Sequence, residues 1–83
     1  MKSLYCAARI NQEGKWNFYR KTPAMILKAA EVSNTHMPKY GFTGKSPDDA
    51  EVFPTKEKLY QFMRNRPETE QVFPYIVTQV VDS

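Results

Sequence analysis

A chain of 83 residues with a formal net charge of +3 is long enough for one small domain with little core to spare for a deep substrate pocket. Its one cysteine and one histidine exclude an internal disulfide and argue against a zinc site. No apolar run approaches the ~18 residues of a membrane-spanning helix, so we expect a cytoplasmic protein that holds no metal or cofactor and does not enter a membrane.

The basic side chains gather in the first part of the chain. Residues 1–45 carry eight Lys or Arg and two Glu, whereas residues 46–83 carry four Lys or Arg and seven acidic residues. Such asymmetry can mark a surface for an anionic partner, although the same charges could also be spread around a solvated surface.

The first predicted element is an antiparallel hairpin. Apolar and polar residues alternate over 4–10 and again over 15–21, and a polar turn that ends in Gly14 joins the two stretches. Antiparallel pairing across this turn would place the small Ala8 opposite the large Phe18, which packs well. The outer face of the hairpin then carries Tyr5, Arg9, Tyr19 and Lys21.

Two short helices are predicted next. Thr22 as a hydroxyl cap, with Pro23 at the first helical position, predicts a helix that runs to Ser33. Thr55 opens a second helix, which ends before Pro67. We expect these helices to pack through apolar stripes, which are Met25, Ile26, Ala29 and Ala30 in the first and Leu59, Phe62 and Met63 in the second.

Between the helices, residues 35–53 show no regular periodicity and contain two glycines and two prolines. We interpret this stretch as a long irregular loop, with one helical turn after Ser46 and a short edge strand over 51–53 as an option.

The last predicted element is a strand over residues 71–81, which is rich in β-branched and aromatic side chains on both faces. We expect the rest of the sheet to pack around it, with Pro74 confining its start to an edge. The predicted fold is α+β, one domain over residues 1–83 in the order β-β-α-loop-(β)-α-β, with an antiparallel-rich sheet and two short helices on one face.

For function, the spacing of His36 and Cys6 gives no support for a catalytic pair. We therefore expect a binding module rather than an enzyme; a small enzyme that uses His36 is the third choice. The leading hypothesis is a protein-binding accessory inhibitor or regulator, of the kind that viruses or mobile elements encode. Its basic face would dock on an acidic groove that otherwise receives nucleic acid.

The alternative function is direct binding of RNA or single-stranded DNA on the hairpin face, where aromatic rings could stack on bases. The hairpin face could also be covered by helices, in which case its tyrosines belong to the core. The candidate partner-binding residues are Tyr5, Arg9, Tyr19, Lys21, His36, Lys39, Tyr40, Phe42 and Lys45, with Tyr19, Tyr40 and Phe42 as anchors.

Overall fold

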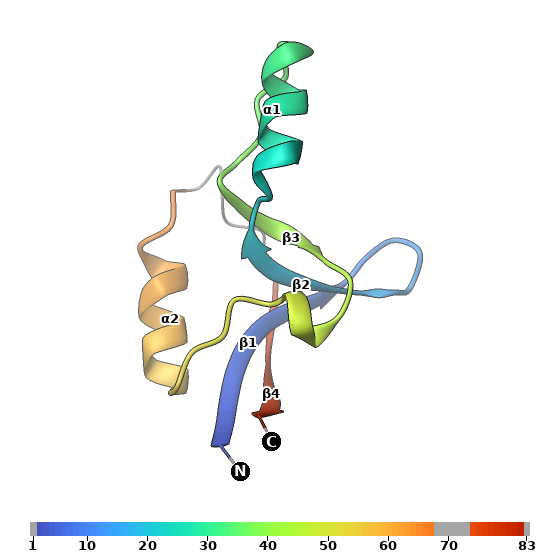
Figure 1. Cartoon of the computed structure of the whole chain (residues 1–83). Helices are drawn as coiled ribbons and strands as arrows, with labels where there is room; N and C mark the ends of the chain where they lie inside the picture. Colours follow the sequence, from blue (N-terminus) through green and yellow to red (C-terminus); the bar gives the residue numbers. More distant parts are fainter. Residues whose placement is uncertain (1, 68–73, 83) are drawn as a thin grey trace.

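The computed structural model describes residues 2–67 and 74–82. Within them, four antiparallel strands form one sheet in the order β3-β2-β1-β4, accompanied by two α-helices and one 3₁₀ turn (Figure 1). The predicted α+β class with an antiparallel sheet and two short helices is confirmed. In chain order the elements are β1 (Lys2–Ile10), β2 (Trp16–Lys21), α1 (Ala24–Val32), β3 (Tyr40–Gly44), η1 (Pro47–Asp49), α2 (Lys56–Arg64) and β4 (Ile76–Asp82).

The N-terminal strand β1 lies inside the sheet, between β2 and β4. Its pairing with β2 places Ala8 opposite Phe18, so the predicted hairpin register is confirmed. The prediction that the last strand organises the sheet is wrong, because β4 pairs only with β1 among the described residues and forms an edge. Part of the predicted strand, residues 71–73, lies outside the described residues.

A short segment before α2 fills the space where β1 and β2 diverge. The backbone N–H of Glu51 donates to the carbonyl of Tyr19 at 2.9 Å. Phe53 and Tyr5 form an antiparallel bridge, in which the N–H of each donates to the carbonyl of the other at 2.8 Å. The optional edge strand over 51–53 is thus reduced to this bridge. These bonds satisfy backbone groups that the diverging strands would otherwise leave unpaired.

The stretch predicted as an irregular loop contains strand β3. Its residues pair antiparallel with β2, Phe42 opposite Tyr19 and Tyr40 opposite Lys21. The prediction missed this strand because glycine is depleted in strands, and β3 contains both Gly41 and Gly44. The single helical turn expected after Ser46 is present as η1.

Gly44 is required by packing, and its replacement gives a first testable prediction. A Cβ atom there would lie 3.0 Å from the Phe18 carbonyl oxygen and 3.1 Å from the Asp49 Cβ, both of which are held in place. Gly44→Ala should therefore lower the free energy of unfolding by about 1–3 kcal/mol, as measured by urea denaturation. The matched control is Gly41→Ala, whose Cβ would meet nothing closer than Thr43 Cγ2 at 3.8 Å; an equal loss in both variants would contradict the steric argument.

Helix α1 differs from the prediction in its cap and in its packing. The Thr22 hydroxyl does not cap the helix; it donates to the carbonyl of Pro38 at 2.7 Å. Met25, predicted to face the sheet, is 82% exposed because α1 points away from the sheet (Figure 1). The predicted stop at Asn34 is confirmed by its left-handed backbone, φ 59°.

Helix α2 forms as predicted and covers one face of the sheet. The Thr55 hydroxyl accepts the backbone N–H of Lys58 at 3.1 Å, which is the expected N-cap. Leu59 and Met63 are buried and Phe62 is half-buried, so the predicted stripe is confirmed. The core between α2 and the sheet consists of Ala7, Tyr19, Phe42, Leu59 and Met63.

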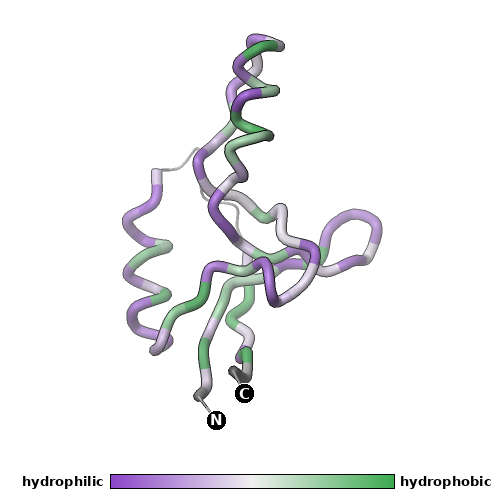
Figure 2. The backbone as a smooth tube through the Cα atoms, viewed as in Figure 1, coloured by the Kyte–Doolittle hydropathy of each residue, from purple (hydrophilic) through white to green (hydrophobic). Residues whose placement is uncertain are grey.

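The two helices differ in where their apolar residues lie. Along the backbone coloured by hydropathy, apolar turns of α1 extend into the part of the molecule farthest from the sheet, whereas α2 lies beside it (Figure 2). Neither helix, nor any other in the described part of the chain, is long and apolar enough to cross a membrane.

Candidate functional site

The outer face of the hairpin, predicted to bind a partner, is the buried face. Tyr19 is only 1% exposed and Phe42 is also buried, while Tyr5 and Tyr40 are half-buried against the same cluster. The reason is that α2 lies across this face and packs its apolar stripe on these rings. Tyr19 and Phe42 are therefore core residues and cannot anchor a partner, which corrects the sequence-based prediction.

The candidate cations do not gather in one cluster, and only Lys21 and Lys39 lie near each other. Arg9 is half-buried, with its guanidinium carbon 5.4 Å from the centre of the Phe42 ring. Lys39 and Lys45 flank opposite ends of β3 and are exposed. Lys21 is exposed at the end of β2. It lies near Lys39, because the next residue, Thr22, donates its backbone N–H to the carbonyl of Lys39 at 2.7 Å. His36 is exposed in the segment that follows α1.

The opposite face of the sheet is the one that α2 leaves uncovered. Ala8 forms its floor, paired with Phe18 on one side and Ile76 on the other. Around this floor, Ile10 is 58% exposed, Trp16 46% and Ile76 50%. Large apolar side chains in one neighbourhood of a sheet face are typical of a surface that another molecule covers.

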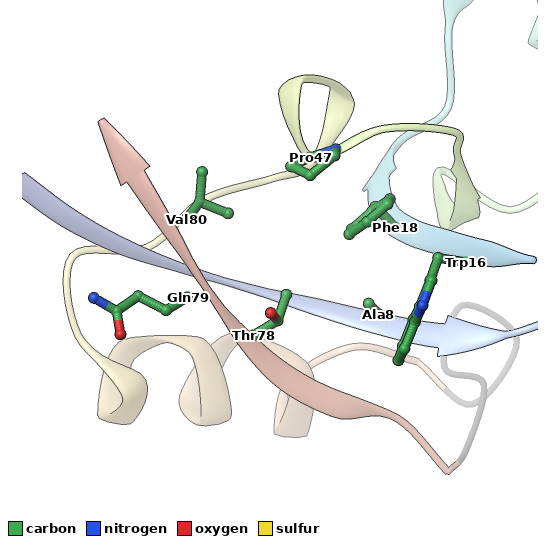
Figure 3. A pocket seen from close by; sticks show the side chains of 7 residues that line it. All are labelled: Ala8, Trp16, Phe18, Pro47, Thr78, Gln79 and Val80. Carbon is green, nitrogen blue, oxygen red and sulfur yellow. The ribbon is translucent and has the colours of Figure 1, made fainter. Parts of the chain in front are cut away.

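Two adjoining hollows run over this face and share Ala8 and Trp16. The larger, of about 460 Å³, lies between Trp16 and Phe18 of β2 and the residues of β4, with Pro47 of η1 at its rim (Figure 3). The smaller, of about 320 Å³, lies on the side of Ile10 and Ile76. We call this surface the open sheet face; it is formed by Ala8, Ile10, Trp16, Phe18, Ile76, Thr78 and Val80. Ala8 and Phe18 are buried in a small cluster against which Ala50 and Val80 pack, so the exposed apolar area comes mainly from Ile10, Trp16 and Ile76.

The open sheet face was missed because both faces of the hairpin carry aromatic residues. The signal that could have identified it is the contrast between the two helices. The stripe of α2 has three large side chains, whereas the stripe expected in α1 is half alanine, which is too small to cover a second face. One well-formed amphipathic helix covers one face of a sheet and leaves the other without a layer.

The chemistry of this surface is apolar. Burial raises the pKa of the Cys6 thiol, which packs with Ala8 and Phe18, so that its reactive thiolate form is disfavoured. In the described part of the chain, no three His, Cys, Asp or Glu side chains gather in a way that could hold a metal ion. The arrangement is suited to hold an apolar group by shape and burial.

Comparison with known proteins found no family model, curated protein or solved structure that matches this chain. The function is therefore inferred from the geometry of the open sheet face.

Proposed function

We propose that this protein is a protein-binding module that holds an apolar segment of its partner on the open sheet face. The observation that supports this is the exposure of Ile10, Trp16 and Ile76 around two adjoining hollows on a face that α2 does not cover. Trp is among the residue types that contribute most to protein interfaces, and Trp16 borders both hollows. Trp16 is therefore the expected anchor of the contact.

The charge of this surface favours a protein over a nucleic acid. The residues that line the larger hollow include no Lys or Arg, and Arg9 is the one cation beside the smaller hollow; Lys15 and Lys45 line a separate hollow that Trp16 also borders. Nucleic-acid affinity depends on cations that neutralise phosphates, and stacking requires exposed rings. The rings proposed for stacking on the opposite face lie in or against the core. A module of this size acts by occupying a surface of its partner, which is the way an accessory inhibitor or regulator works.

The proposal is tested by capture of partners from cell lysate with the tagged chain, with and without nuclease, followed by mass spectrometry. We expect a protein partner that survives nuclease and is lost at least tenfold, which is about 1.4 kcal/mol, in the double variant Trp16→Thr, Ile76→Thr. Threonine keeps the strand propensity at both positions, and circular dichroism checks that the variant is folded.

The matched control is Lys21→Ala with Lys39→Ala, two exposed cations that line neither hollow of the open sheet face. This control should retain the partner. Capture that nuclease abolishes, or that the lysine variant abolishes while the Trp16 variant retains it, would overturn the proposal and favour nucleic-acid binding through the basic residues.

A further inference from the structure

Helix α1 presents an exposed apolar stripe. Met25, Ala29 and Val32 follow the i, i+4, i+7 spacing that places side chains on one side of a helix. Met25 is 82% exposed and Val32 is 88% exposed. The inner side of the same helix is already occupied, because Ala30 is buried and Ile26 is half-buried. The chain thus has an apolar helix without a sheet beneath it and an apolar sheet face without a helix above it.

The helix cannot reach the open sheet face of its own chain. Its first residue, Ala24, follows β2 after only Thr22 and Pro23. Thr22 is fixed by two hydrogen bonds of 2.7 Å, one from its N–H to the carbonyl of Lys39 and one from its hydroxyl to the carbonyl of Pro38. Both ends of the α1 segment are therefore held at the end of the β2–β3 pair, and α1 projects outward from there (Figure 1).

The two surfaces are similar in size, and each has a charge of opposite sign at its border. A nine-residue helix is about 13.5 Å long, and three strands about 4.8 Å apart span about 10 Å. The small Ala29 lies between the larger stripe residues and leaves room for a ring such as that of Trp16. Lys28, the one cation of α1, borders the stripe. On the sheet side, the exposed Asp48 follows Pro47 at the rim of the larger hollow.

We propose that the partner of the open sheet face is α1 of a second copy of this chain. The proposal rests on the proposed function and names the occupant of the same surface. In a two-fold dimer, the stripe of Met25, Ala29 and Val32 of each copy covers the Trp16 side chain of the other. Each helix–sheet contact then occurs twice, which is the rule for an interface of this symmetry.

The area available is that of a small specific interface. Burial of one aliphatic side chain removes about 60–120 Å² from water, and five large side chains per copy are between 46% and 88% exposed on the two surfaces. They supply about 300 Å² of apolar surface per copy. Because somewhat more than half of a typical protein interface is apolar, this corresponds to about 500 Å² of total interface per copy. The two copies together bury about 1,000 Å², the lower end for specific association, so we expect a dimer that forms at micromolar concentration.

The test is sedimentation velocity of the full chain over a range of concentrations, together with its fluorescence. The chain has one tryptophan, Trp16, so its emission reports directly on the open sheet face. We expect dimer formation and a blue shift of the emission at the same concentrations. Met25→Glu with Val32→Glu should be monomeric at every concentration and should keep the red-shifted emission.

The matched control is Lys58→Gln with Gln61→Glu, which changes the net charge by the same amount at exposed positions of α2. This control should dimerise like the original chain. A dimer that survives the α1 variant but not Trp16→Thr would overturn the inference in favour of face-to-face pairing of sheets. A chain that stays monomeric at the highest concentration would also overturn it, while Trp16-dependent capture from lysate would still support the proposed function.

Discussion

Replacement of Tyr19 by alanine should remove about 3–5 kcal/mol from the free energy of unfolding, the usual cost of truncating a buried aromatic ring. Tyr19 is fully enclosed, and its ring centre lies 4.9 Å from that of Phe42 and 6.0 Å from that of Tyr40. It also meets the edge of Phe62 from α2 at 6.3 Å. A domain of this length is stable by about 4–12 kcal/mol, so the loss amounts to a large part of the total.

The measurement is urea denaturation followed by far-UV circular dichroism. Lys21→Ala is the matched control, because Lys21 lies in the same strand but is exposed, and it should change the free energy by less than about 0.5 kcal/mol. If Tyr19→Ala remained as stable as the control, the ring would not belong to the core, and the outer hairpin face would again be a candidate binding surface.

Replacement of Leu59 by alanine should detach α2 from the sheet, at a cost of about 2–5 kcal/mol. Leu59 is fully buried in the cluster that also contains Ala7 and Met63. Because α2 is the one helix that covers the sheet, no other element replaces its packing within the described residues. Hydrogen exchange should therefore accelerate in α2 first, and in the Tyr19 region of β2 with it.

The control for this second prediction is Gln61→Ala, an exposed position two residues further along the same helix. Alanine raises helix propensity there, so the control should be neutral or slightly stabilising. Unchanged exchange rates in α2 of the Leu59 variant would show that the cap at Thr55 and the helix itself, rather than the packing, hold α2 in place.

The sequence predicted the elements whose signals are local. The hairpin followed from alternation and from Gly14, and α2 followed from the Thr55 cap and the spacing of Leu59 and Met63. Strand β3 was not predicted, because it contains two glycines, and one of them, Gly44, is required by a close approach of neighbouring chain that depends on tertiary structure. Such contacts cannot be inferred from the propensity of the strand itself.

The prediction of the candidate site failed at a different step, which is the choice between the two faces of one sheet. Alternation identifies which residues share a face, and it did so correctly for Tyr5 and Tyr19 and for Ala8 and Phe18. Which face the helix covers depends on the path of the connection between β3 and α2 and on the direction of α1. Neither leaves a periodic signal in the sequence, so the buried tyrosines were interpreted as a binding surface.

The pairing of β1 with β4 has a consequence for synthesis of the protein. Residues at opposite ends of the described chain are neighbours in the sheet, Lys2 with Asp82 and Ala8 with Ile76. During translation the β1–β2 hairpin can form early, but the other edge of β1 stays open until β4 has left the ribosome. Open strand edges recruit other chains, so we expect the nascent chain to keep an aggregation-prone edge on β1 until β4 has emerged.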